Sequence, residues 1–258
     1  MDSFDCDRAW KNLMRIRVEQ VSFAAGRVTQ KGTPISGYEV LRNVSFVVEK
    51  GNRIAIVGAS GSGKTTLLKL LNRLIEPSAG SIEFEGKPYS EIPVLQLRQQ
   101  ILFVAQEPKL FGTTIREALI YPLKLRNLKD IDQRIDQVVE RMNIPREWLD
   151  RSELELSTGE RQWIAIARAL ICQPAVLLLD EPIANLDAAR SEILLKVLAQ
   201  VDSTVLVVTH QFEWAERFAG RILQLQQGQL IRNEMGIDWN SVKNTIAQIE
   251  REEAAEWD

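Results

Sequence analysis

One short segment constrains this chain more than any other: a glycine-rich turn between an apolar strand and an apolar helix. The strand is predicted at Ile54–Val57 and the helix at Leu67–Ile75. The turn, Gly58–Thr65, reads GASGSGKT and fits the pattern G-x-x-x-x-G-K-[ST]. Glycines let such a turn curl so that successive N–H groups point into one concavity, and the following helix adds the positive end of its dipole.

The side chains of this turn indicate what it binds. Lys64 can reach the β- and γ-phosphates of a nucleotide, and Thr65 can ligate Mg²⁺. A glycine-rich turn can also merely join a strand to a helix, but its place between this strand and this helix favours phosphate binding. The predicted phosphate loop consists of Gly58, Ala59, Ser60, Gly61, Ser62, Gly63, Lys64, Thr65 and Thr66.

A second candidate site follows another buried strand. Val176–Leu179 is apolar throughout and leads directly into Asp180 and Glu181. In open α/β sheets, ligands bind beyond the carboxyl ends of the strands. We expect Asp180 to hold Mg²⁺, directly or through water, and Glu181 to polarise an attacking water as a general base. Two acids can also simply begin a surface loop, and the phosphate loop upstream favours the catalytic interpretation.

The segments after the acidic pair alternate between helix and strand. Helices are predicted at 188–200 and 211–219, and strands at Val205–Val208 and Ile222–Leu225. This alternation predicts a parallel sheet covered on both faces.

The flanking segments have different patterns. Ile16–Val18 and Val44–Val48 are short and β-like, and Gly26–Gly37 between them has the composition of a loop or hairpin tip. Residues 114–149 are mostly helical in period. The tail, 238–258, is predicted to be an exposed amphipathic helix.

Composition excludes several classes. The net charge of −3 argues against a general electrostatic grip on nucleic acid, so we expect no nucleic-acid partner. Two lone cysteines make neither a disulfide framework nor a metal site. No apolar stretch approaches the roughly 18 residues that span a bilayer, and the N-terminus has no secretory pattern. We therefore expect a soluble protein, which would act at a membrane only by docking.

Several further segments, taken in order, resemble the ATP-binding-cassette (ABC) ATPase family. Leu156–Gln162, which reads LSTGERQ and precedes an apolar helix, looks like the family signature. Gln106 looks like the Q-loop glutamine, Asn185–Asp187 like the D-loop, and His210, the only histidine, like the H-loop switch. The resemblance covers about residues 16–235, and the order of the motifs is more specific than any one of them.

The resemblance implies a fold. We expect a P-loop NTPase with a RecA-like α/β core, an antiparallel β-subdomain at the N-terminus and an α-helical subdomain inserted at about 107–165. The ATPase domain would cover 16–236, between an N-terminal extension at 1–15 and an acidic C-terminal tail at 237–258.

The resemblance also implies roles. Two copies would form a homodimer with each ATP between the phosphate loop of one and the signature of the other, where Ser157 and Gly159 contact the γ-phosphate. His210 would hold the γ-phosphate and the catalytic water, Gln106 would ligate and sense Mg²⁺, and Asp187 would bridge the protomers. Taken singly, Ser157 has the character of a helix N-cap and the others that of surface residues.

The sequence departs from the family pattern at three positions. Thr158 stands in place of the first glycine of the usual LSGG core, and Trp163 in place of an arginine. Ala25 occupies the position of the aromatic residue that normally stacks on adenine, and Phe23 or Tyr38 could substitute for it.

The resemblance favours a transporter subunit that docks on a polytopic membrane permease at the cytoplasmic face, through Phe103–Leu123. A DNA-repair ATPase would need a long coiled coil between Lys64 and Asp180, for which there is no room, and translation-type proteins usually carry two cassettes. A cytosolic assembly ATPase of the iron–sulfur type stays open. Gln106–Gly112 is similar to bacterial iron-export and plant aluminium-tolerance ATPases, which would imply export of metal ions or small solutes.

Overall fold

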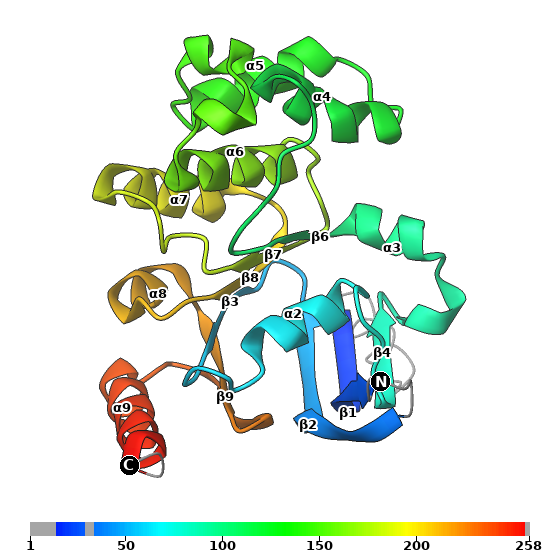
Figure 1. The fold of residues 1–258 in the computed structure, drawn as a ribbon, viewed down its shortest axis with the longest axis vertical. Coiled ribbons are helices and arrows are strands. Elements are labelled where there is room, and N and C mark those ends of the chain that lie inside the picture. The colour runs from blue at the N-terminus through cyan, green and yellow to red at the C-terminus, as the bar shows by residue number, and fades with distance from the viewer. Residues whose placement is uncertain (1–13, 29–33, 256–258) are drawn as a thin grey trace, which may run out of the picture. The chain divides into compact units, whose positions relative to one another are not determined.

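The computed structural model describes residues 14–28 and 34–255 of the 258-residue chain. They form two compact units, which are described in turn. The first contains the described residues up to Arg98 and from His210 onward, and the second is Gln99–Thr209. Figure 1 labels the elements of both. No helix in the described part of the chain has both the length and the apolar character needed to cross a bilayer.

The first unit contains the antiparallel β-subdomain that the sequence predicts. Apolar residues alternate along its strands and leave one face buried. Each strand is antiparallel to its neighbour, and their order is β2 (Pro34–Glu49), β1 (Met14–Val28), β4 (Ala79–Phe84) and β5 (Lys87–Pro88).

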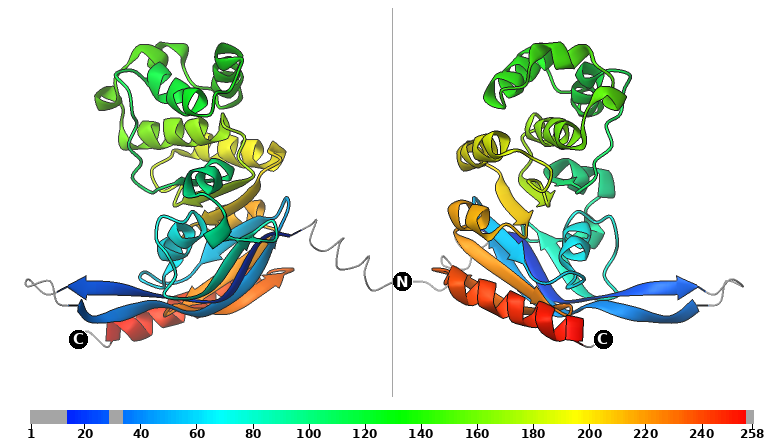
Figure 2. Two further views of the ribbon diagram at one scale, coloured as in Figure 1. Left: turned by 90° about the vertical axis from the view of Figure 1, so that its right-hand side faces the viewer. Right: turned by 60° about the vertical axis from the view of Figure 1, so that its left-hand side comes forward.

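The hairpin of β1 and β2 is longer than predicted. β4 pairs with β1 only as far as Ser22, but β1 and β2 stay paired out to Val28 and Pro34. The two ends of the Gly26–Gly37 segment, predicted to be a loop or hairpin tip, are therefore strand, and residues 29–33 between them lie outside the described residues. Figure 2 shows this part as a two-stranded ribbon that extends past β4. Gly26, Pro34 and Gly37 indicate a loop locally, whereas cross-strand pairing, a non-local effect, sets the conformation of the described residues.

The remaining strands of the first unit carry the phosphate loop. β3 pairs in parallel with β9, and β9 pairs antiparallel with β10. Sequence analysis did not predict the strand β10. The first helix begins at Lys64 and ends at Leu71, earlier than predicted. The bounds are β3 (Arg53–Val57), α2 (Lys64–Leu71), α3 (Val94–Gln100), α8 (Phe212–Phe218), β9 (Arg221–Gln226), β10 (Gln229–Met235) and α9 (Trp239–Ala255).

The C-terminal helix α9 corrects a prediction. We expected an exposed amphipathic helix, but its apolar face is buried in the first unit. Trp239, Val242 and Ile246 pack in one cluster with Ala55 of β3 and with residues of α8 and β9. An ion pair between Lys243 and Glu213 of α8, 2.9 Å long, adds a polar contact at the rim. The acidic composition of the tail describes only its outer face.

The second unit contains a parallel sheet and a helical region. Its strands are ordered β6, β7 and β8, all parallel, and β7 and β8 are buried at every residue, as expected of strands covered on both faces. Between β6 and α6 the chain forms only helices and turns, in agreement with a helical region there. The bounds are β6 (Ile101–Val104), α4 (Ile115–Leu125), α5 (Ile131–Arg141), α6 (Thr158–Leu170), β7 (Val176–Asp180), α7 (Ala188–Gln200) and β8 (Thr204–Val208), with 3₁₀ turns at Arg146–Asp150 and Glu153–Glu155. A further 3₁₀ turn, Tyr89–Glu91, belongs to the first unit.

Candidate functional site

The phosphate loop curls tightly between β3 and α2 in the first unit. Gly58 has φ of +151°, and a Cβ at this position would lie 2.1 Å from the carbonyl oxygen of Leu225 in β9. Gly63, the N-cap of α2, is in the left-handed region with φ of 100°. α2 has neither an acidic residue in its first turn nor a side-chain cap. The N–H groups of that turn and the positive end of the helix dipole are therefore left for an anionic ligand.

Lys64 lies over the loop that precedes it. Its ammonium donates to the carbonyl oxygens of Gly58 and Ala59 at 2.8 and 2.7 Å, and the hydroxyl of Ser62 lies at 3.4 Å. The side chain is buried, so the positive charge is held inside the curl. A buried ammonium within this curl is a suitable charge for a phosphate, in agreement with the prediction from the loop sequence.

Two neighbouring segments support the loop from outside. The N–H of Gly228, in the β9–β10 turn, donates to the carbonyl oxygen of Ser62 at 3.2 Å. On β2, Leu41 lies so close that a Cβ at Gly63 would approach its Cδ2 to 2.6 Å. The N–H of Arg42 donates in turn to the Gly228 carbonyl at 2.8 Å. Sequence analysis did not single out Leu41 or Gly228, because both contacts join segments distant in sequence.

The other predicted residue of the first unit is His210. It is exposed and immediately precedes Gln211, the N-cap of α8. The rest of the predicted site residues, Gln106, Ser157, Gly159, Asp180, Glu181 and Asp187, belong to the second unit.

The acidic pair lies at the carboxyl end of β7, as predicted. Asp180 is the last strand residue and is buried, whereas Glu181 is half-buried. Glu181 has φ of 48°, the left-handed region that non-glycine residues rarely occupy. Its N–H donates to the carbonyl oxygen of Val208 in β8 at 2.9 Å, which holds the turn in place. Such backbone strain is concentrated at functional sites, where the surroundings enforce it.

The signature segment and the D-loop form one packed cluster. Ser157 is the N-cap of α6 and shares a capping box with Glu160: the N–H of Ser157 donates to the Glu160 carboxylate at 2.8 Å. This bond is the main reason why the pKa of Glu160 is lowered. Gly159 lies directly against the D-loop, because a Cβ there would be 2.2 Å from the Asn185 carbonyl oxygen. Only glycine fits at this contact.

Arg190 joins the same cluster, and sequence analysis missed it. Its backbone N–H donates at 2.7 Å to Asp187, the N-cap of α7, and its guanidinium lies 3.5 Å from the same carboxylate. The guanidinium also lies 4.0 Å from Glu160 and over the Trp148 ring at 5.2 Å. A basic residue three positions after an N-cap aspartate is the signal that could have identified it.

Trp163, which departs from the family pattern, has a structural explanation. Its side chain is 1% exposed, and its indole N–H donates to the carbonyl oxygen of Met142, just beyond α5, at 3.1 Å. A buried tryptophan requires such a partner. The substitution therefore packs α6 against the end of α5, away from the exposed Ser157 and Thr158.

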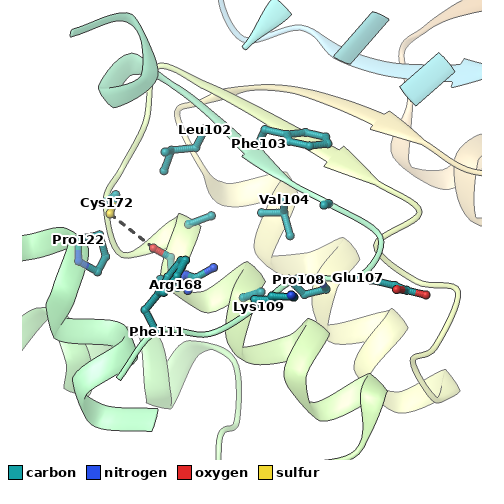
Figure 3. A pocket seen from close by; sticks show the side chains of 13 residues that line it. Leu102, Phe103, Val104, Glu107, Pro108, Lys109, Phe111, Pro122, Arg168 and Cys172 are labelled. Atoms are coloured by element: carbon teal, nitrogen blue, oxygen red, sulfur yellow. Dashed lines mark hydrogen bonds between the residues drawn. The ribbon is translucent and has the colours of Figure 1, made fainter. Parts of the chain in front are cut away.

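A pocket of about 340 Å³ lies beside Gln106, between the end of β6, α4 and α6. Gln106 itself is exposed and is not among its lining residues. The lining is largely apolar, with Phe103, Phe111 and Pro122 among its members and Glu107, Lys109 and Arg168 as its charged residues. Figure 3 shows Arg168 alongside the Phe111 ring, and the guanidinium lies 5.9 Å from the ring centroid.

Arg168 contributes a positive charge to this pocket. Burial lowers the pKa of its guanidinium, and the charge of Glu153 opposes this shift. Next to the pocket, the exposed rings of Phe111 and Tyr121 lie 6.1 Å apart, and Leu125 is exposed one helical turn further along α4. We call Phe111, Tyr121, Leu125, the pocket and Arg168 the partner groove.

The residues present suit magnesium more than a transition metal. The described part of the chain has no group of three or more His, Cys, Asp or Glu side chains that could hold a metal ion. Mg²⁺ needs no such cluster, because it binds through one or two carboxylates together with substrate phosphates. Asp180 in the second unit and Thr65 in the first offer oxygen donors of this kind.

Comparison with known proteins assigns the chain to a family. Residues 41–184, more than half of the chain, match the family model described as ABC transporter. LolD of Legionella pneumophila, a lipoprotein-releasing system ATP-binding protein, is 39% identical over 211 residues, which cover 77% of this chain and 92% of LolD.

Two further matches extend the comparison. YfiB of Bacillus subtilis, an ABC transporter ATP-binding protein, is 38% identical over 223 residues; the match covers 84% of this chain but only 37% of YfiB. A solved ATP-binding cassette, in a dimeric post-hydrolysis state with ADP and phosphate, superposes with a TM-score of 0.74 at 26% identity, covering 85% of this chain and 98% of that one.

Proposed function

This chain belongs to the ABC transporter family as an ATP-hydrolysing subunit, and on that premise we propose that it powers transport through a separate membrane subunit. LolD is the ATP-binding protein of a lipoprotein-releasing system, and the match covers 92% of its length. The observation that carries the proposal is the buried ammonium of Lys64, which is held inside a curl of backbone at an uncapped helix N-terminus.

ATP would bind with its phosphates in the curl. Lys64 would exchange its contacts with Gly58 and Ala59 for the β- and γ-phosphates, because a charge-assisted bond to phosphate is stronger than a bond to a neutral carbonyl. Thr65, Asp180 and Gln106 would hold the Mg²⁺ ion. When bound, this ion would supply positive charge that neutralises the charge developing on the phosphates.

Hydrolysis would proceed by in-line attack of water on the γ-phosphorus. Glu181 would accept a proton from the attacking water as the new P–O bond forms and the bond to the β-phosphate breaks. Its strained backbone and the bond from its N–H to Val208 fix where the carboxylate begins, which is what a general base needs. His210 would hold the γ-phosphate and orient the water.

The signature cluster would serve a second copy of the chain. Ser157 and Gly159 lie at the N-terminus of α6, a suitable place for an anion, yet they belong to a different unit from the phosphate loop. In a homodimer they would meet the γ-phosphate held by the partner, and Asp187 would bridge the two copies. The dimeric form of the related cassette supports this arrangement.

The partner groove would receive the membrane subunit. An apolar pocket beside exposed aromatic rings fits a short amphipathic segment, and the positive charge of Arg168 in the pocket favours a carboxylate on that segment. The protein would then lie peripherally at the cytoplasmic face. Cargo would be set by the membrane subunit, and export of a metal ion or small solute stays a prediction from sequence resemblance.

A binding experiment tests the nucleotide site. ATP affinity is measured by calorimetry for the wild type and for Lys64→Ala. We expect tight binding in the first and its loss in the second. Retained affinity in Lys64→Ala would refute the phosphate-loop assignment.

A capture experiment tests the groove and separates the transporter proposal from a cytosolic assembly ATPase. Tagged wild-type protein is incubated with detergent-solubilised native membranes, beside Arg168→Glu and the charge-reversal control Lys129→Glu, an exposed residue outside the groove. We expect a polytopic membrane protein with the wild type and the control but not with Arg168→Glu. Equal recovery by all three would contradict docking at the groove, and recovery of soluble partners alone would favour the assembly ATPase.

A further inference from the structure

We propose that Arg190 is a positioning residue for ATP hydrolysis, which ties the side chain of the D-loop aspartate to the signature segment. The inference rests on the proposed function, in which Asp187 and Ser157 both serve a second copy of the chain. It depends on the contacts of one backbone N–H and one guanidinium, all of which lie within the second unit.

Arg190 contacts both oxygens of the Asp187 carboxylate. Its backbone N–H donates to Oδ1 at 2.7 Å, and this is the N-cap bond of α7. Its guanidinium nitrogen Nη1 lies 3.5 Å from Oδ2. An N-cap bond uses only one side-chain oxygen. Because Arg190 faces the second oxygen as well, it fixes the direction in which the carboxylate points.

The other terminal nitrogen of the same guanidinium faces the signature. Nη2 lies 4.0 Å from Oε1 of Glu160, whose Oε2 accepts the N–H of Ser157 at 2.8 Å. The bond from the Ser157 N–H lowers the pKa of Glu160 most, and the charge of Arg190 lowers it further. The planar guanidinium therefore spans two carboxylates, one at the N-terminus of each helix. The ammonium of lysine is a compact point charge and cannot span them in the same way.

A buried aromatic ring orients this guanidinium. The guanidinium of Arg190 lies 5.2 Å from the centroid of the Trp148 ring, and Trp148 is 5% exposed. A cation over an aromatic face is attracted by the ring, and a guanidinium can also stack on it. Because the ring is held by its own burial, it restricts the positions that the guanidinium can take.

These contacts are suited to positioning more than to stability. The side chains of Arg190 and Glu160 are 27% and 22% exposed, but that of Asp187 is 56% exposed. Ion pairs near the surface contribute little to the free energy of unfolding, because water and salt screen them. The backbone contact between Gly159 and Asn185 already joins the two segments, and Arg190 adds a tie between their side chains. We therefore expect loss of Arg190 to slow hydrolysis with little loss of stability.

The test measures kcat and KM for phosphate release, ATP affinity by calorimetry and thermal unfolding for variants of the full chain. Arg190→Gln removes the charge, and Arg190→Lys keeps it on a single nitrogen. Arg151→Gln is the matched control, because it removes the other guanidinium at the Trp148 ring, 5.9 Å from the centroid, and leaves Arg190 in place.

We expect Arg190→Gln to lower kcat roughly two- to 30-fold. Its ATP affinity should equal that of the wild type, because the phosphate loop belongs to the first unit. Its melting temperature should fall by no more than about 4 °C. Arg190→Lys should lose part of the rate, and Arg151→Gln should match the wild type.

Double variants show whether Arg190 acts through its two carboxylate partners. Arg190→Gln is combined with Asp187→Asn, which keeps an N-cap oxygen, and separately with Glu160→Gln. We expect each double variant to lose less rate than the product of its two single losses, because either substitution already breaks the same tie. Losses that multiply in both pairs would mean that Arg190 acts independently of these carboxylates, and would overturn the inference.

Two other results would also overturn it. The first is a wild-type kcat in Arg190→Gln, or in Arg190→Lys if Arg190→Gln does not fold. The second is a loss of rate matched by weaker ATP binding, which would indicate a disturbed fold.

Ser157→Ala and Asp187→Asn separate these failures from failure of the proposed function. If either of them lowers kcat while Arg190→Gln does not, only the role of Arg190 is wrong. If neither changes kcat, the roles proposed for a second copy are wrong, and the role of Arg190 is wrong with them.

Discussion

Replacing Gly159 by alanine is expected to disable ATP turnover although it adds a single methyl group. The new Cβ would lie 2.2 Å from the carbonyl oxygen of Asn185 and 3.3 Å from its carbon, and real Cβ atoms essentially never come within 3.0 Å of such a group. The obstacle is backbone, so it cannot rotate away. Either the N-terminus of α6 or the D-loop must shift by about 1 Å.

The size of the effect follows from that shift. Overpacking of this kind costs about 1–3 kcal/mol of stability. A displacement of about 1 Å in residues that position a substrate costs about 100-fold in rate. The shift would move Ser157 and Asp187 together, because both flank the contact. We therefore expect a large loss of turnover with a smaller loss of stability.

The assay compares phosphate release at saturating ATP and thermal unfolding for three proteins. Gly220→Ala is the matched control, because a Cβ at Gly220 meets nothing within 4 Å and the residue has no positive φ. It should turn over ATP and unfold like the wild type. If Gly159→Ala also retains the wild-type rate and melting temperature, the packing of the signature against the D-loop contributes neither to ATP turnover nor to stability, and the reasoning fails.

Three further predictions concern the packing around the site. Trp163→Phe removes the bond to the Met142 carbonyl and should lower the free energy of unfolding by about 1–3 kcal/mol; denaturant titration checks this, and an unchanged midpoint would contradict it. The pKa of Glu160 is lowered in the folded state, so its contribution to stability is present above the unfolded value of about 4.3 and is lost as the pH falls through the lower folded value. Glu160→Gln should therefore lose less stability than the wild type on acidification below about pH 5. Parallel curves of unfolding free energy against pH for the two proteins would contradict this. Ile246→Ala should cost about 2–5 kcal/mol because Ile246 is buried in the first unit, whereas the exposed Asn244→Ala should cost little; equal effects would mean that α9 is not part of the core.

The sequence predicted the parts of the fold that depend on local pattern. Apolar runs such as Val176–Leu179 predicted the buried strands, and the alternation of strand and helix predicted the parallel sheet. The prediction was wrong at the ends of the β1–β2 ribbon, where cross-strand pairing holds residues with a loop-like composition in strand conformation. At α9 the acidic outer face hid the buried face, because composition averages over the two.

The candidate site shows the same difference between features that depend on local sequence and features that depend on long-range contacts. Motif spacing singled out Lys64 as a candidate and predicted that Asp180 follows a buried strand, since each depends on a few consecutive residues, and the roles of both stay predictions. It could not show why Gly159 must be glycine, because the obstacle is the carbonyl of Asn185.

The central claim is that Glu181 accepts the proton from the water that hydrolyses ATP, and phosphate release by wild type and Glu181→Gln, measured side by side with ATP and Mg²⁺, tests it most directly. The account predicts turnover in the wild type and a loss of about 100- to 10,000-fold in the variant, which should still bind ATP. Hydrolysis by Glu181→Gln at the wild-type rate would contradict it.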